Sequence, residues 1–298
     1  MTLPRQILPG RFYVVTRRCT QQQFLLRPDD ETNNAFLYCL TEAAQRHRID
    51  VILPSAMSNH HHTTVFDRHG NIVEFMERFH KMLAKCQNAL RGRWENMWAS
   101  RSPSLVKLVT REDVIAKLVY AATNPVKDGL VERVRHWPGV NGLGALLTGR
   151  RLQSHRPRHF FRRNGPMPKA LSLELTIPPE LGDRDEFLRE VRERVARVEA
   201  EAAAMRAQTG RRVLGRRRVL AQKWYESPTS HEPRRGLSPR VASKDKWARM
   251  QALQTNEAFI ADYRKARLAM CRGTPIPFPA GTYWLHRFAG VPVETEFC

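Results

Sequence analysis

The sequence contains few cysteines, no long apolar run and too few acidic residues to balance the basic ones. The five cysteines are widely spaced and form no C-x-x-C pair: Cys19, Cys39, Cys86, Cys271 and Cys298. Their scarcity and spacing exclude a disulfide framework and a zinc knuckle as the basis of the fold. No run of about eighteen apolar residues is present, and residues 1–10 lack the apolar segment of a signal peptide. We therefore expect a reduced, cytoplasmic protein with no membrane partner.

Basic residues outnumber acidic ones by a wide margin. The chain of 298 residues has 50 Lys and Arg against 29 Asp and Glu, a formal net charge of +21. Hydrophobic residues make up 42% of the chain, which is enough for a packed core, so a disordered or fibrous protein is not expected. A positive surplus of this size makes a polyanion, above all nucleic acid, the leading partner.

The first half of the sequence alternates between strand and helix patterns. Short β-branched and aromatic runs predict strands, and apolar residues at three-and-four spacing predict helices. In chain order we expect a strand at 12–15, a helix from Asp30, strands at 49–53 and 59–66, a helix over 72–90, a strand at 105–109 and a helix from Arg111. Pro54-Ser55 predicts a break between the two middle strands, and Thr110 with Asp113 predicts a helix-capping box. This order predicts an α+β, ferredoxin-like sandwich, in which helices cover a mostly antiparallel sheet.

Arginine dominates the second half of the sequence. A shift in composition predicts a basic linker over 146–182 with a strand near 171–177, and helices are expected over 183–208 and 244–270. Arginines contact phosphates and aromatic rings stack on bases, so the intervening segment is a candidate for DNA binding. Its candidate residues are Arg211, Arg212, Arg216, Arg217, Arg218, Trp224, Arg234 and Arg235. A solvated charged face is the alternative for this segment.

Three consecutive histidines stand within the second of the two middle strands. Side chains alternate along a strand, so His60 and His62 project from one face and His61 from the other. The two imidazoles on the shared face are about 7 Å apart along the strand and can converge on one divalent metal. Exposed histidines at a polar strand end are the alternative.

The helix from Arg111 places a tyrosine on its polar side. On a helical wheel with 100° steps, Lys117, Tyr120 and Asn124 lie opposite the apolar face. Tyr120 and Asn124 are one turn apart on that side. Two plainer explanations remain open: Asn124 before Pro125 could simply end the helix, and Lys117 could be a solvated surface lysine.

These motifs, in this order, resemble those of the single-tyrosine HUH transposases, and most closely the REP-associated tyrosine transposases. The matching features are a His-x-His pair on a strand and Tyr120-Ala-Ala-Thr-Asn124-Pro125 about sixty residues later. Three further segments agree with the family: Leu8-Pro9-Gly10 before the first strand, Met57-Ser58-Asn59 before the histidines, and Trp137-Pro138 after the tyrosine helix. The resemblance spans residues 3–140 and does not extend past about residue 150.

The resemblance implies a fold, an activity and a set of site residues. It implies an HUH catalytic domain over 1–145. The composition of the remaining chain predicts that the linker and a helical, basic DNA-binding accessory region over 183–298 follow it. Tyr120 would be the nucleophile, His60, His62 and Asn124 the ligands of Mg²⁺ or Mn²⁺, and Lys117 a phosphate contact. The enzyme would nick and rejoin single-stranded, hairpin-forming DNA through a 5′-phosphotyrosine intermediate. His61 departs from the family, whose middle residue is a bulky hydrophobe, and indicates either a tolerated neutral histidine or an altered active site.

Two other functions remain open from the sequence. One is a catalytically inactive protein that keeps the HUH fold and binds DNA hairpins or RNA. The other is a zinc-dependent hydrolase that uses all three histidines, although no Glu or Asp in a recognisable motif offers a general base. The sequence also leaves a homodimer open.

Overall fold

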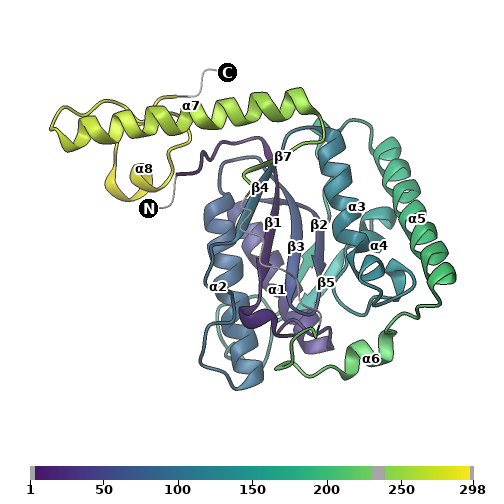
Figure 1. The fold of residues 1–298 in the computed structure, drawn as a ribbon. Helices are drawn as coiled ribbons and strands as arrows, with labels where there is room; N and C mark the ends of the chain where they lie inside the picture. Colours follow the sequence, from purple (N-terminus) through teal and green to yellow (C-terminus); the bar gives the residue numbers. More distant parts are fainter. Residues whose placement is uncertain (1–3, 230–238, 296–298) are drawn as a thin grey trace.

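The computed structural model describes residues 4–229 and 239–295 (Figure 1). Its first half has the β-α-β-β-α-β-α order that the sequence predicts. The elements are β1 Arg11–Arg18, α1 Asp30–His47, β2 Asp50–Ala56, β3 His60–Asp67, α2 Ile72–Arg91, β4 Ser104–Leu108 and α3 Arg111–Lys127. A 3₁₀ turn, Thr20–Gln22, follows β1.

The main sheet has the strand order β2-β3-β1-β4-β7, where β7 is the short strand Val241–Ala242. β3 lies between β1 and β2 and is antiparallel to both, and β4 is antiparallel to β1. This is the ferredoxin-like arrangement, so the predicted fold class is confirmed. Helices α1 and α2 cover one face of the sheet, and α3 covers the other (Figure 1).

Local hydrogen bonds explain where the helices begin. Asp29 precedes α1 and accepts a hydrogen bond from the Thr32 amide at 2.8 Å, as an N-cap residue does. Thr110 and Asp113 form the predicted capping box at the start of α3. These caps supply acceptors for helix amides that have no partner within the helix, which is why both starting points could be predicted from the sequence.

The predicted break at Pro54-Ser55 is wrong, because β2 continues through both residues to Ala56. A proline lacks the N–H that an interior strand needs, but β2 is the last strand on its side of the sheet. The segment around 140–142 pairs with its outer edge: the Ala56 amide donates to Val140 O, and the Gly142 amide donates to Pro54 O. Pro54 therefore takes part in this pairing through its carbonyl oxygen, and the N–H that it lacks is not needed.

The chain beyond α3 packs onto both sides of this unit. It contains α4 Leu143–Thr148, β5 Leu152–His155, β6 Ala170–Leu173, α5 Arg184–Thr209, α6 Arg216–Ala221, α7 Lys246–Cys271 and α8 Trp284–Ala289, with 3₁₀ turns Val134–His136 and Pro179–Leu181. The helices predicted over 183–208 and 244–270 are confirmed, and the predicted strand is the shorter β6. β5 and β6 form a hairpin against α1.

Helix α5 belongs to the same hydrophobic core as the first half. It packs along α3, and its Phe187, Val191 and Val195 join the main buried cluster. Arg194 of α5 pairs with Glu112 of α3 through hydrogen bonds of 2.6 and 2.5 Å. The division into a catalytic domain, a linker and an accessory region stays a prediction. None of the helices in the described part of the chain is long and apolar enough to span a membrane.

Candidate active site

His60, His62 and Tyr120 meet where β3 begins, on the face of the sheet that α3 covers. The His60 and His62 ring centroids are 5.0 Å apart, and the His62 and Tyr120 ring centroids are 5.6 Å apart. Tyr120 is 44% exposed, so the ring lies against the histidines while remaining open to solvent. Strand alternation thus predicted correctly that His60 and His62 share a face, and the helical wheel predicted that Tyr120 lies off the buried face of α3.

Both histidines are oriented by a neighbouring oxygen. His60 Nδ1 lies 2.7 Å from Asn59 Oδ1, and His62 Nδ1 lies 2.7 Å from Thr16 Oγ1. An amide oxygen only accepts hydrogen bonds, so His60 carries its proton on Nδ1 and keeps a lone pair on Nε2. Hydrogen bonds of this kind hold an imidazole in the orientation that metal binding requires. The sequence did not predict the contact of Thr16, because its partner is distant in the sequence.

Asn124 completes the inner part of the site. Its amide Nδ2 lies 3.3 Å from His60 Nε2, and the residue is 5% exposed. The interpretation of Asn124 as a helix terminator is wrong, since α3 continues through Pro125 to Lys127. The site therefore contains two imidazole nitrogens from the sheet and an amide from the helix that packs on it.

Burial keeps both imidazoles neutral. It lowers the pKa of His60 well below its usual value, and His62 and Arg18 lower it further. The pKa of His62 is lowered to about 4 by burial, with Arg18 and Lys117 as further causes. At neutral pH both rings are therefore uncharged, which is the form that binds metal ions.

Imidazole nitrogens and an amide are groups that could hold a divalent metal ion. Across residues 4–229 and 239–295, no group of three or more His, Cys, Asp or Glu side chains is arranged to hold one. The candidate ligands are His60, His62 and Asn124, whose amide would have to turn its oxygen toward the metal in place of the Nδ2 that faces His60. Imidazole ligands suit Mn²⁺ better than Mg²⁺, which prefers oxygen.

Two lysines flank the tyrosine ring. Lys127 Nζ lies 5.3 Å and Lys117 Nζ lies 5.8 Å from the Tyr120 ring centroid. Lys117 was predicted to lie on this side of the helix, and Lys127 was overlooked. The signal that could have found it is its spacing, because residue i+7 lies two turns beyond residue i on the same side of a helix. Two positive charges at the exposed tyrosine are placed to attract an anionic group.

His61 lies on the opposite face of the sheet and is completely buried. Its ring contacts Phe36 and Phe79, with centroids 5.6 and 5.3 Å away. His61 Nε2 lies 3.0 Å from His80 Nε2, and Nδ1 lies 3.1 Å from Thr63 Oγ1. Burial lowers the pKa of His61 to about 3, so it is neutral. His61 is thus a hydrogen-bonded core residue, and the three histidines do not form one cluster.

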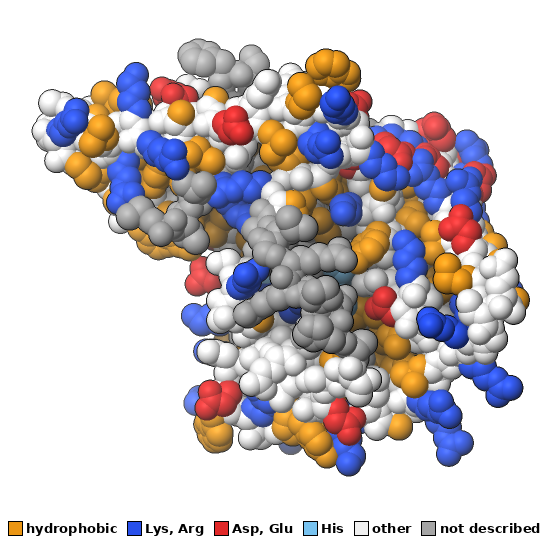
Figure 2. All heavy atoms as spheres, viewed as in Figure 1, with side chains coloured by type: hydrophobic (Ala, Val, Ile, Leu, Met, Phe, Trp, Pro, Cys, Tyr) orange, Lys and Arg blue, Asp and Glu red, His pale blue; other side chains and the backbone are white. Residues whose placement is uncertain are grey.

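The basic segment predicted to bind DNA lies near the same end of the sheet. Arg211, Arg212, Arg216, Arg217 and Arg218 are exposed, Trp224 is partly buried, and Arg234 and Arg235 lie outside the described residues. The Leu214 and Gly215 amides donate to Gly129 O and Leu130 O, just beyond α3. Lys and Arg side chains are spread over the face in Figure 2, with acidic residues between them.

Comparison with known proteins finds likenesses in structure only. The sequence matches no protein-family model and no curated protein. The fold is similar to that of a REP-associated tyrosine transposase bound to a REP hairpin, with 14% identity and a TM-score of 0.40 over 60% of this chain and 96% of that chain. It is also similar to a protein provisionally named as a transposase from Deinococcus radiodurans R1, with 15% identity and a TM-score of 0.29 over 42% and 97% of the two chains. Because the identities and TM-scores are this low, the similarity carries no argument about function. The proposed function is based on the geometry of the site itself.

Proposed function

We propose that this protein is a metal-dependent transposase or strand transferase that nicks and rejoins single-stranded, hairpin-forming DNA. The observation that carries the proposal is the contact of an exposed tyrosine ring, Tyr120, with the ring of His62, 5.6 Å between centroids. His62 is one of two partly buried, neutral histidines beside an amide. A nucleophile that must reach a large substrate has to be exposed, whereas metal ligands are best held by their surroundings.

The reaction would exchange one phosphoester bond for another. Tyr120 Oη attacks the phosphorus of a phosphodiester and forms an O–P bond, while the bond from phosphorus to the 3′ oxygen breaks. The phenol proton is lost, and the departing oxygen gains a proton to become a free 3′-hydroxyl. The downstream strand stays linked to Tyr120 through its 5′-phosphate, and attack by a second 3′-hydroxyl reverses the step and restores the phenol.

The side chains around Tyr120 would have three separate roles in this reaction. His60, His62 and Asn124 would hold Mg²⁺ or Mn²⁺, which when bound stabilises the charge that develops on the phosphate oxygens. Asn59 and Thr16 keep the two imidazoles in place through their Nδ1 atoms. Lys117 and Lys127 would attract the phosphate to the tyrosine.

A DNA partner agrees with the charge of the chain. The net charge of +21 and the exposed arginines of 211–218 favour a polyanion, and binding of this kind weakens as salt rises. Replacing Arg216, Arg217 and Arg218 together by Gln should weaken oligonucleotide binding at low salt and reduce its salt dependence. Unchanged affinity would remove this segment from the DNA-binding surface.

The proposal is tested by trapping the covalent intermediate. Wild-type protein, Tyr120→Phe and the control Tyr225→Phe, which alters another exposed tyrosine, are incubated with a labelled single-stranded hairpin and Mn²⁺. An adduct that survives SDS is expected with wild type and Tyr225→Phe but not with Tyr120→Phe, and all three should still bind the hairpin. An undiminished adduct with Tyr120→Phe would refute the assignment. Binding without an adduct from any of the three would instead favour a non-catalytic hairpin-binding protein.

A further inference from the structure

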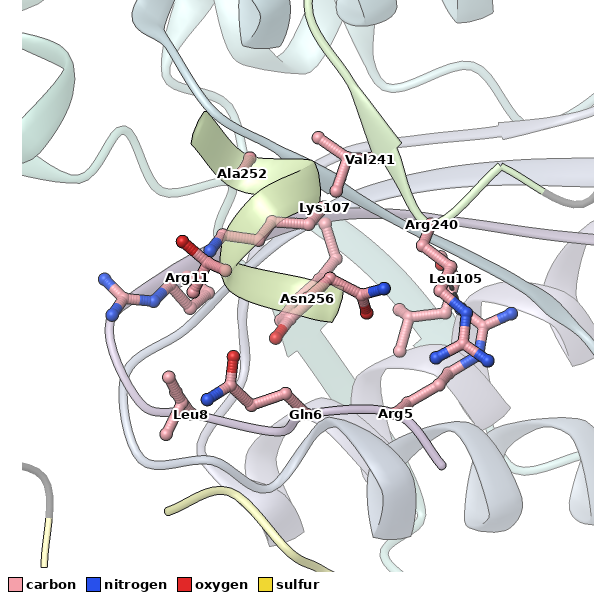
Figure 3. Close-up of a pocket in the computed structure, with 12 residues that line it drawn as sticks. Arg5, Gln6, Leu8, Arg11, Leu105, Lys107, Arg240, Val241, Ala252 and Asn256 are labelled. Carbon is pink, nitrogen blue, oxygen red and sulfur yellow. Dashed lines mark hydrogen bonds between the residues drawn. The ribbon is translucent and has the colours of Figure 1, made fainter. Parts of the chain in front are cut away.

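A small basic cavity lies between the N-terminal segment, β1, β4 and helix α7 (Figure 3). Arg5, Arg11, Lys107 and Arg240 line it, and Asn256 reaches into it from α7. No acidic side chain of the described residues is among its lining. Asp67 stands opposite Arg11 in the pairing of β1 with β3, so it offsets charge at that end of the cavity.

Arg5 and Arg240 form an unusual pair at the other end of the cavity. Figure 3 shows the Arg5 and Arg240 guanidinium groups side by side, with the Asn256 amide facing them. Arg5 donates a hydrogen bond to Leu105 O, and Arg240 donates one to Pro4 O, so backbone carbonyls hold both side chains in this arrangement. The pKa of Arg5 is lowered first by burial and then by the charge of Arg240. Two like charges brought together in a partly buried place gain most from a bound anion.

Several tertiary contacts build the cavity. The Ile7 amide donates to Gly281 O at 3.0 Å, and Gln6 Nε2 donates to Ala280 O at 3.1 Å. Gly281 has a φ of +86°, and a Cβ there would lie 2.6 Å from the Gln6 side chain, so only glycine fits this close approach. The Lys107 amide donates to Arg240 O at 2.9 Å, which ties β4 to the chain that enters β7.

The size of the cavity limits what it can hold. Its volume is about 50 Å³, whereas one water needs roughly 10–15 Å³ by the same measure. A group the size of a few waters, such as a tetrahedral oxyanion, therefore fits, and a nucleoside does not. Guanidinium groups match phosphate oxygens in geometry as well as in charge.

We propose that Arg5, Arg240 and Asn256 form a binding site for a single phosphate group. The site is separate from the candidate active site. Arg5 binds Leu105 O of β4, Leu105 pairs with Val15, and His60 of β3 pairs with Arg18, so the two places are roughly 10 Å apart along β1 and lie on strands on either side of it. The phosphate comes either from the backbone of bound nucleic acid or from a free phosphate ion. Only the first of these sources depends on the proposed function.

The test introduces a carboxylate into the site without removing a positive charge. Asn256→Asp places the carboxylate beside Arg5 and Arg240, where it takes the place of the phosphate. Gln254→Glu is the control, since it makes the same charge change at an exposed position on α7 outside the cavity. Arg5→Gln serves as a second variant, because it removes one of the two guanidinium groups.

Two measurements distinguish the sources. In the first, Tm is measured in sodium phosphate and in sodium chloride of equal ionic strength. At phosphate about tenfold above its Kd, wild type and Gln254→Glu should gain about 2–4 °C, while Asn256→Asp and Arg5→Gln gain nothing. In the second, the affinity for a single-stranded oligonucleotide is measured over a range of salt. The slope of log K against log salt should fall by about 0.7 in Asn256→Asp if the site holds a backbone phosphate.

Each outcome decides the proposal. Loss of the phosphate-dependent Tm gain supports the site, and loss of slope as well identifies the nucleic-acid backbone as the source. A loss of slope alone indicates a phosphodiester that free phosphate does not replace. If Asn256→Asp and Arg5→Gln behave like Gln254→Glu in both measurements, the phosphate site does not exist. Neither measurement involves Tyr120, so this result would leave the proposed strand transfer untouched.

Discussion

The hydroxyl of Ser55 donates a hydrogen bond of 2.9 Å to the carbonyl oxygen of Ala121. In a regular α-helix this carbonyl would accept from the amide of residue 125, but that residue is Pro125 and has no N–H. A buried serine on β2 thus satisfies the carbonyl that the proline leaves unpaired. The Asn141 amide donates in the same way to Ala122 O at 2.9 Å. These contacts let α3 continue past Asn124 and hold it against the histidines.

We expect Ser55→Ala to destabilise the protein by about 1–3 kcal/mol, because it leaves a buried carbonyl without a partner. The cost should shrink in a Pro125→Ala background, where residue 125 regains an N–H for Ala121 O. Urea unfolding of the two single variants and the double variant measures this coupling. Equal costs of Ser55→Ala in both backgrounds would show that the serine does not compensate for the proline.

The contact of Thr16 with His62 leads to a prediction about metal affinity. Thr16→Val keeps the shape of the side chain but removes the oxygen at His62 Nδ1, so Mn²⁺ affinity should fall by about 10–100-fold. Excess Mn²⁺ should restore adduct formation. Thr64→Val is the matched control, since this buried hydroxyl on the same face has no hydrogen-bond partner among the described residues. Calorimetric titration with Mn²⁺ compares the two, and equal affinities would show that Thr16 has no role in orienting His62.

The buried His61–His80 pair should matter for stability and not for chemistry. His61→Leu leaves a polar nitrogen of His80 buried without its partner, at a cost of about 1–3 kcal/mol. Replacing both histidines by Leu should cost less than His61→Leu alone, because it removes the unpaired group as well. Adduct formation per folded molecule should match wild type in both variants. A catalytic defect in the folded double variant would contradict a purely structural role for His61.

The sequence predicted the parts of the site that depend on one element at a time. Strand alternation placed His60 and His62 together, and the helical wheel placed Lys117 and Tyr120 on the open side of α3. Contacts between elements could not be predicted in this way. The prolines at 54 and 125 indicate breaks when viewed locally, but remote partners satisfy the backbone groups around them. Thr16 and the cavity at Arg5 and Arg240 likewise depend on residues far apart in the chain.

Lys127 provides a test of how the phosphate is held at Tyr120. Lys127→Gln should slow adduct formation by about 10–100-fold, the worth of one hydrogen bond to a charged group. Lys85→Gln makes the same charge change on α2, which covers the other face of the sheet, and should leave the rate unchanged. Single-turnover rates at saturating oligonucleotide separate this effect from weaker binding. Equal rates for the two variants would place Lys127 outside the phosphate site.

The central claim is that Tyr120 becomes covalently linked to DNA. The most direct measurement is peptide mapping by mass spectrometry of protein incubated with a single-stranded hairpin and Mn²⁺ or Mg²⁺, then digested with nuclease and protease. We predict the mass of a 5′-linked nucleotide on the peptide that contains Tyr120 and on no other. A nucleotide on a different residue, or no modified peptide with either metal, would contradict it.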